Sequence, residues 1–105
     1  MALFHKFINA PSASTRKILT RRILTGRASE EAEALNAANW GAVLLVQGTI
    51  PDMFGAVDVG SKASSALAVE VTGNCPQNIV TMAFIGNVAD VKQVLSALKS
   101  EGVIA

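Results

Sequence analysis

The stretch ALAVEVTGNCPQNIVTMAFIG, residues 66–86, consists of two apolar runs separated by a tight turn. Both runs contain valine and other apolar side chains in the density that is typical of β-strands. Gly73 can adopt a positive φ, and Pro76 fixes its own φ and removes a backbone donor. The stretch therefore predicts a pair of strands, 66–71 and 79–85, joined by a turn that holds Cys75 at its tip.

Cys75 is the only cysteine in the chain. A single thiol forms no disulfide within the chain, and it does not build a metal site inside one subunit. If Cys75 has metal chemistry, copies related by symmetry must supply the other ligands. The alternative is that Cys75 is a small apolar residue at a turn. One unpaired cysteine also fits a reducing cytoplasm.

The composition predicts a single domain that associates with other subunits. The chain has 105 residues, of which half are hydrophobic and 16% are charged, whereas charged residues average about 25% in soluble domains. So little charge indicates that part of the surface does not face water, as in an oligomer with broad contacts. The net charge of +1 argues against a nucleic-acid-binding protein.

Basic residues are concentrated near the N-terminus, and no acidic residue precedes Glu30. Six of the nine basic residues are Lys6, Arg16, Lys17, Arg21, Arg22 and Arg27. Such a segment resembles an organelle transit peptide, but the strand-like pattern of residues 16–24 argues against that interpretation. No apolar run is long enough for a membrane span or a signal-peptide core, so no membrane partner is expected.

The first part of the chain predicts a tail, a strand and a short helix. Residues 1–14 are expected to form an N-terminal tail that ends in a turn, with His5 as an exposed polar side chain, and residues 15–105 to form the domain. Residues 16–24 have apolar doublets that favour a strand ended by Gly26. Residues 29–31, Ser-Glu-Glu, favour a helix start by capping and by charge, with the helix continuing to Ala38 or Asn39.

The remaining elements alternate between strand and helix. Residues 42–46 form an apolar run between two glycines, which indicates a strand buried on both faces. Pro51 opens a helix after Thr49, and that helix is expected to direct Met53, Phe54, Ala56, Val57 and Gly60 toward the core. A last helix follows Gly86-Asn87, with its apolar residues at helical spacing, and ends at Gly102. The order predicts an α+β domain in which helices cover one face of a sheet.

The familiar catalytic patterns are missing from the sequence. The only histidine lies in the expected tail, so no Cys/His dyad is expected. The residues before Cys75 have neither the glycine spacing nor the Lys-Ser/Thr of a phosphate loop. Asp52 and Asp58 are six residues apart and do not share a helix face. We therefore expect that the protein is not an enzyme.

Three segments resemble a known family. They are AVLLVQG at 42–48, FGAVD at 54–58 with Lys62-Ala63, and IGNVADVK at 85–92. From Trp40 to Leu98 the chain is similar to a bacterial microcompartment (BMC) shell domain. The resemblance implies a ferredoxin-like antiparallel sheet backed by helices and a cyclic homo-hexamer, with a smaller ring as an alternative. It also implies a cytoplasmic location in a microcompartment shell, beside other shell proteins and encapsulated enzymes.

The order of elements resembles the circularly permuted members of this family. In ordinary members a last strand follows the final helix, whereas here the chain ends at Ala105, soon after that helix. The missing strand is expected at the front instead, at residues 17–24, followed by a linking helix. The resemblance covers about ninety residues.

The turn GNCPQ, residues 73–77, is similar to the Gly-X-Cys-Pro-Gln loop of shell proteins from glycyl-radical-enzyme microcompartments. The resemblance implies that Cys75 thiolates of several subunits share one iron–sulfur cluster, of the 4Fe–4S type, at the central pore. Backbone N–H groups of Gly73–Cys75 are expected to donate hydrogen bonds to the cluster. Gln77 is expected either to hydrogen-bond a neighbouring loop or the surroundings of the cluster, or to orient the turn together with Pro76. Asn74 occupies the variable position of the loop and has no expected ligand role.

Three further positions follow from the same resemblance. Lys62 matches the lysine that packs against its counterpart at the edge between neighbouring hexamers, and its alternative is an ordinary solvated lysine. Arg21 and Arg22, repeated around a sixfold axis, would attract anionic metabolites.

The leading hypothesis is a structural shell protein whose pore-bound cluster transfers electrons or passes iron–sulfur units across the shell. One alternative is a shell protein with a metal-free pore for small metabolites. Another is a cytosolic regulatory domain of ferredoxin-like architecture, and the last is a thiol-redox enzyme, which lacks a resolving cysteine and a base.

Overall fold

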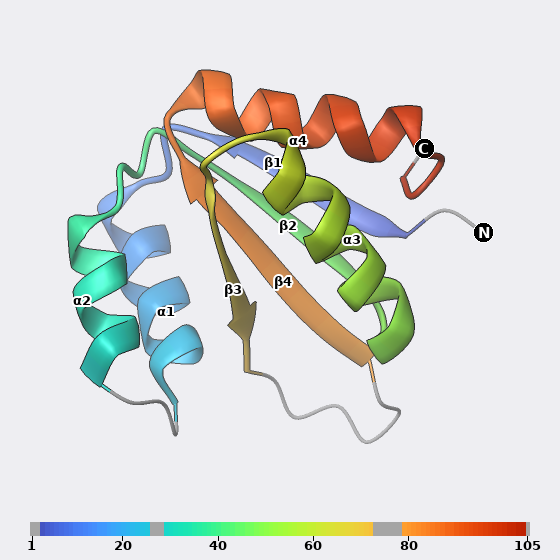
Figure 1. Ribbon diagram of the computed structural model, residues 1–105. Helices are drawn as coiled ribbons and strands as arrows, with labels where there is room; N and C mark the ends of the chain where they lie inside the picture. The colour runs from blue at the N-terminus through green and yellow to red at the C-terminus, as the bar shows by residue number, and fades with distance from the viewer. Residues whose placement is uncertain (1–2, 26–28, 73–78, 105) are drawn as a thin grey trace.

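A computed structural model describes residues 3–25, 29–72 and 79–104 of the chain (Figure 1). In chain order, the elements are β1 (Phe4–Asn9), α1 (Ala13–Leu24), α2 (Ser29–Ala37), β2 (Ala42–Thr49), α3 (Ile50–Ala63), β3 (Leu67–Val71), β4 (Ile79–Gly86) and α4 (Val88–Ser100). The fold is α+β, as expected. None of the helices within the described ranges is long and apolar enough to cross a membrane.

The four strands form one antiparallel sheet in the order β1-β2-β4-β3. The predicted pair of strands is confirmed, since β3 pairs with β4 in the register Val69↔Ala83. The prediction that residues 1–14 form a tail is wrong, because Phe4–Asn9 pair with β2 as an edge strand. His5 is accordingly a half-buried residue of β1 and not an exposed tail residue.

The predicted strand at residues 16–24 is a helix, α1. Ser12 caps its start by accepting a hydrogen bond from the Thr15 N–H at 3.1 Å. Leu19 and Ile23, four residues apart, lie on one side of the helix and are both buried. One residue of each apolar doublet, Leu19 and Ile23, therefore forms the buried stripe of a helix, whereas Ile18 is half exposed. The strand at the front of the chain is β1.

Helices cover both faces of the sheet, not one face as predicted (Figure 1). On one face, α3 and α4 enclose a core with Leu44, Val46 and Phe84 of the sheet. On the other face, α1 and α2 pack through Leu19, Ile23 and Leu35 onto the sheet. Because β2 and β4 lie in the middle and are covered on both sides, their apolar runs are continuous, as predicted for β2.

The caps of α3 and α4 agree with the sequence pattern. Thr49 caps α3, with Pro51 in its first turn, and Asn87 caps α4 by accepting from the Asp90 N–H at 2.8 Å. Gly102 adopts φ +73° just after α4, a conformation that favours glycine.

Two glycines of α3 lie in opposite environments, and we expect opposite effects from Gly→Ala substitution. A Cβ at Gly60 would lie 2.5 Å from Cε1 of the Phe84 ring, whereas a Cβ at Gly55 would have no neighbour within 4 Å. Overpacking costs about 1–3 kcal/mol, more than the roughly 0.5–1 kcal/mol that alanine gains over glycine in a helix. Urea unfolding at fixed protein concentration should show Gly60→Ala destabilised and Gly55→Ala slightly stabilised. Equal effects at the two positions would contradict this packing of α3 on Phe84.

Candidate functional site

The predicted site residues belong to the connection between β3 and β4. β3 ends at Val71 and β4 begins at Ile79, and the pair Val71↔Thr81 makes these ends neighbours. We call this end of the sheet the loop end. Five predicted residues lie outside the described residues, namely Gly73, Asn74, Cys75, Pro76 and Gln77. The structure thus describes where their connection leaves and re-enters the sheet.

The last turn of α1 contacts the loop end. The Thr72 N–H donates to the Arg22 carbonyl oxygen at 3.1 Å, one residue before the connection begins. Arg21 and Arg22 are exposed on this last turn. Their cationic groups therefore belong to a helix end beside β3, not to a strand, and their role in attracting anions remains a prediction.

Metal ligands are not grouped within the described part of the chain. Residues 3–25, 29–72 and 79–104 contain no group of three or more His, Cys, Asp or Glu side chains able to hold a metal ion. His5, on β1, belongs to no such group. A metal centre that uses the described residues of one subunit is therefore not found, and Cys75 is outside them.

Lys62 lies in the last turn of α3, away from the loop end. The helix starts at the loop end, directly after β2, and runs back toward the start of β3. The Lys62 Nζ lies 2.8 Å from Asp58 Oδ2, and both side chains are largely exposed. The hydrogen bond that Lys62 donates to Asp58, together with the negative charge of that carboxylate, raises the pKa of Lys62, so the ammonium stays protonated at neutral pH. Its predicted contact at a hexamer edge is not tested by the structure.

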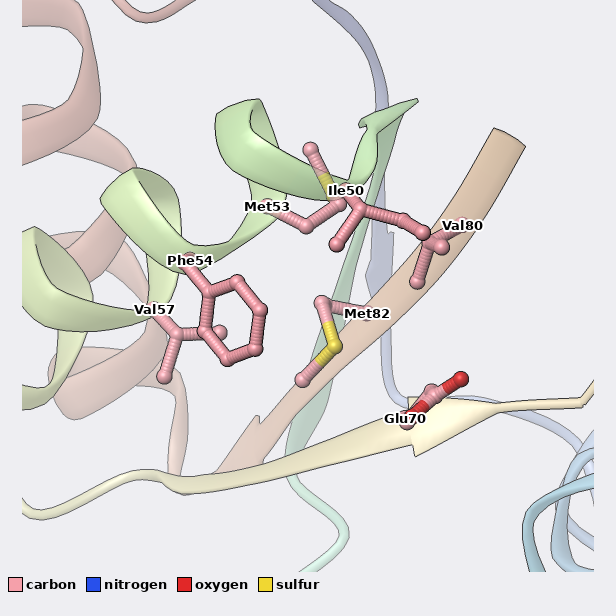
Figure 2. Close-up of a pocket in the computed structure, with 7 residues that line it drawn as sticks. All are labelled: Ile50, Met53, Phe54, Val57, Glu70, Val80 and Met82. Carbon is pink, nitrogen blue, oxygen red and sulfur yellow. The ribbon is translucent and has the colours of Figure 1, made fainter. Parts of the chain in front are cut away.

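An apolar groove lies between α3 and the β3 side of the sheet, and we call it the α3 groove (Figure 2). Its volume is about 300 Å³, and seven residues line it: Ile50, Met53, Phe54, Val57, Glu70, Val80 and Met82. Glu70 is the charged residue of this lining. Phe54 is 73% exposed, so the prediction that it points into the core is wrong. Its ring borders the groove instead.

The α3 groove was not predicted, because it forms only when three successive elements, α3, β3 and β4, pack against one another. One signal was present in the sequence. Phe54 follows Met53 directly in a helix, and adjacent helical residues point in directions about 100° apart, so a helix that directs Met53 to the centre of the core turns Phe54 toward its flank.

The fold is similar to that of microcompartment shell proteins. Two solved structures share it, and both are ligand-free GrpU microcompartment shell proteins. The one from Pectobacterium wasabiae has a TM-score of 0.64 and 27% identity, and the match covers 91% of this chain and 99% of that chain. The one from Clostridiales bacterium 1_7_47FAA also has a TM-score of 0.64, with 22% identity over 94% of this chain and 90% of that chain. No protein-family model and no curated protein matches the sequence.

Proposed function

We propose that the protein is a structural, non-enzymatic shell protein of a bacterial microcompartment that assembles as a cyclic hexamer. The observation that carries this proposal is the shared fold with GrpU shell proteins over nearly the whole of both chains. The low charged fraction of the chain adds support, since a subunit with broad contacts needs fewer solvated residues. The proposed location is the shell in the cytoplasm, among other shell proteins and around enclosed enzymes.

We further propose that the chain is a circular permutation of the ordinary shell domain. A strand transferred from the end of the chain to its front must keep its place in the sheet, and β1 is an integral edge strand beside β2. The two ends of the chain must also lie close together. The Leu3 N–H donates to the Val103 carbonyl oxygen at 3.0 Å, and Leu3 forms a bridge with Ile104. Both features support the proposal.

We place an iron–sulfur cluster, of the 4Fe–4S type, at the centre of the ring, bound by Cys75 of several subunits. Thiolate is the ordinary ligand of such clusters, and one chain has one thiol, so a shared site on the symmetry axis matches the donor chemistry. When bound, the cluster would supply one-electron transfer, or would itself be the cargo that crosses the shell. The motif GNCPQ supports this site, and a metal-free pore is the alternative.

The positions of the loop end and of Lys62 support the tile geometry. With the loop end at the axis, α3 extends outward and places Lys62 toward the periphery, where neighbouring rings would meet. The exposed ammonium and its carboxylate partner Asp58 are both available at that surface.

Lys62→Asp is expected to leave the ring intact and to abolish extended sheets and shell incorporation. The change places like charges at Asp58 and position 62 and reverses the charge of the edge, while removing little buried surface. Electron microscopy should show hexagonal sheets for the wild type and none for the variant, and light scattering should show the same ring for both. Lys99→Asp is the matched control, because Lys99 is also an exposed lysine in the last turn of a helix. Sheets that persist in Lys62→Asp would contradict the edge role, and a monomeric wild type would contradict the shell proposal.

A further inference from the structure

Two apolar features lie at opposite edges of the sheet but near the same end. At the outer edge of β1, Phe4 is 80% exposed. At the β3 side lies the α3 groove. Phe4 pairs with Gln47, which pairs with Thr81, whereas Glu70 of the groove pairs with Met82. Phe4 and the groove therefore lie on adjacent rows of the sheet, close to the loop end.

This placement has a consequence for the proposed ring, on which the inference rests. If the loop end of every subunit points to the axis, the β1 edge of one subunit faces the β3 edge of the next. Features on adjacent rows near the loop end then lie at a similar distance from the axis. Contacts between two different surfaces of the same chain are heterologous, and they close into a ring when the rotation between subunits allows it.

We propose that Phe4 of one subunit inserts into the α3 groove of the neighbouring subunit. The lining of the groove is chemically suited to bind an aromatic ring. The thioethers of Met53 and Met82 and the ring of Phe54 make favourable contacts with a phenyl group. Insertion removes from water two of the most exposed apolar side chains of the described chain, Phe4 and Phe54.

The charges of the two surfaces are complementary. Glu70 is acidic and lines the groove. Lys6 is exposed and lies two residues after Phe4, so both project from the same face of β1. Glu70 already takes part in an interaction within its own chain, and a carboxylate with two oxygens can accept several donors. Lys6 of the neighbour is thus placed beside Glu70 when Phe4 enters the groove.

The contact also defines how neighbouring sheets overlap. Phe4 shares a face with Gln47 and, two and four rows further on, with Leu45 and Val43, the face that α1 and α2 cover. The α3 groove lies on the opposite face. Insertion therefore requires the β1 edge of one subunit to overlap the β3 edge of the next, in the manner of roof tiles.

Cross-linking tests the contact directly. The chain carrying both Phe4→Cys and Phe54→Cys, in a Cys75→Ser background, is treated with a short bismaleimide and examined on a denaturing gel. A head-to-tail contact between the two positions should give a ladder of covalent species up to the size of the ring. Each single variant in the same background should remain monomeric on the gel, because one position has no copy of itself within reach.

Two further variants measure the energetic role of the contact. Phe4→Ala should raise the protein concentration at which the ring dissociates about tenfold or more, as expected of a buried aromatic anchor. Ile18→Ala, which removes an exposed side chain of α1, should leave it unchanged. Lys6→Glu and Glu70→Lys should each weaken the ring, and their combination should restore it.

The outcomes separate this inference from the proposed function. A ring that forms without the ladder, and that dissociates at the same concentration in Phe4→Ala, overturns the Phe4 contact and leaves the shell proposal standing. A wild-type chain that is monomeric by light scattering overturns both.

Discussion

Phe84→Ala is expected to lower the free energy of unfolding by about 3–5 kcal/mol, the usual cost of removing a fully buried phenylalanine. Phe84 has no exposed surface and lies in β4, where it is paired with Leu44 on one side and Ala68 on the other. Its ring also packs against α3 at Gly60, whose missing Cβ makes room for it. The total free energy of unfolding of a small domain is about 5–15 kcal/mol, so the variant should be marginally folded.

Urea unfolding at one fixed protein concentration measures this loss, because dissociation of an oligomer makes apparent stability depend on concentration. Ile18→Ala is the control, since half of the Ile18 side chain is already exposed, and its effect should stay within about 0.5 kcal/mol. A loss below about 1 kcal/mol for Phe84→Ala would mean that the core of the α3/α4 face is not organised around this ring.

The central part of the fold could be predicted because local and tertiary signals agree there. Thr49 and Pro51 cap and start α3, Asn87 caps α4, and the apolar run after Gly41 forms the doubly covered strand β2. In each case the residues that favour the element locally are also those that the core requires.

The N-terminal elements were predicted wrongly for two different reasons. β1 is short and lies at an edge, and it exists because it pairs with β2, whose residues are distant in sequence, so no local pattern identifies it. In α1, the apolar pairs Ile18-Leu19 and Ile23-Leu24 are compatible with both the helical and the strand period. The N-cap at Ser12 favours the helix. Ser12 lies within residues 1–14, the segment predicted to end in a turn.

The same distinction applies to the site. The connection between β3 and β4 could be predicted, because both strands are continuous in the sequence around Gly73 and Pro76. The α3 groove and its distance from Phe4 could not, because they depend on the packing of α3 across β4 and on the position of β1. The role of Cys75 stays a prediction.

Cys75→Ser is expected to abolish bound iron while leaving the ring intact. A serine hydroxyl is a poor replacement for thiolate at a cluster, and substitution on a predicted Gly/Pro turn should change the stability by less than about 0.5 kcal/mol. After anaerobic reconstitution with iron and sulfide, the wild type should absorb near 400 nm, as iron–sulfur proteins in general do. It should hold about one cluster per ring, because each chain supplies one thiol.

Two neighbouring substitutions distinguish ligand loss from distortion of the turn. Gly73→Val should weaken cluster binding although the thiol is retained, because a β-branched residue disfavours the positive φ expected there. Asn74→Ser, at the position with no predicted ligand role, should bind iron as the wild type does. Iron and sulfide analysis of the purified rings measures all four proteins. Iron uptake by Cys75→Ser equal to that of the wild type, or one cluster per subunit, would exclude a Cys75 site shared on the axis.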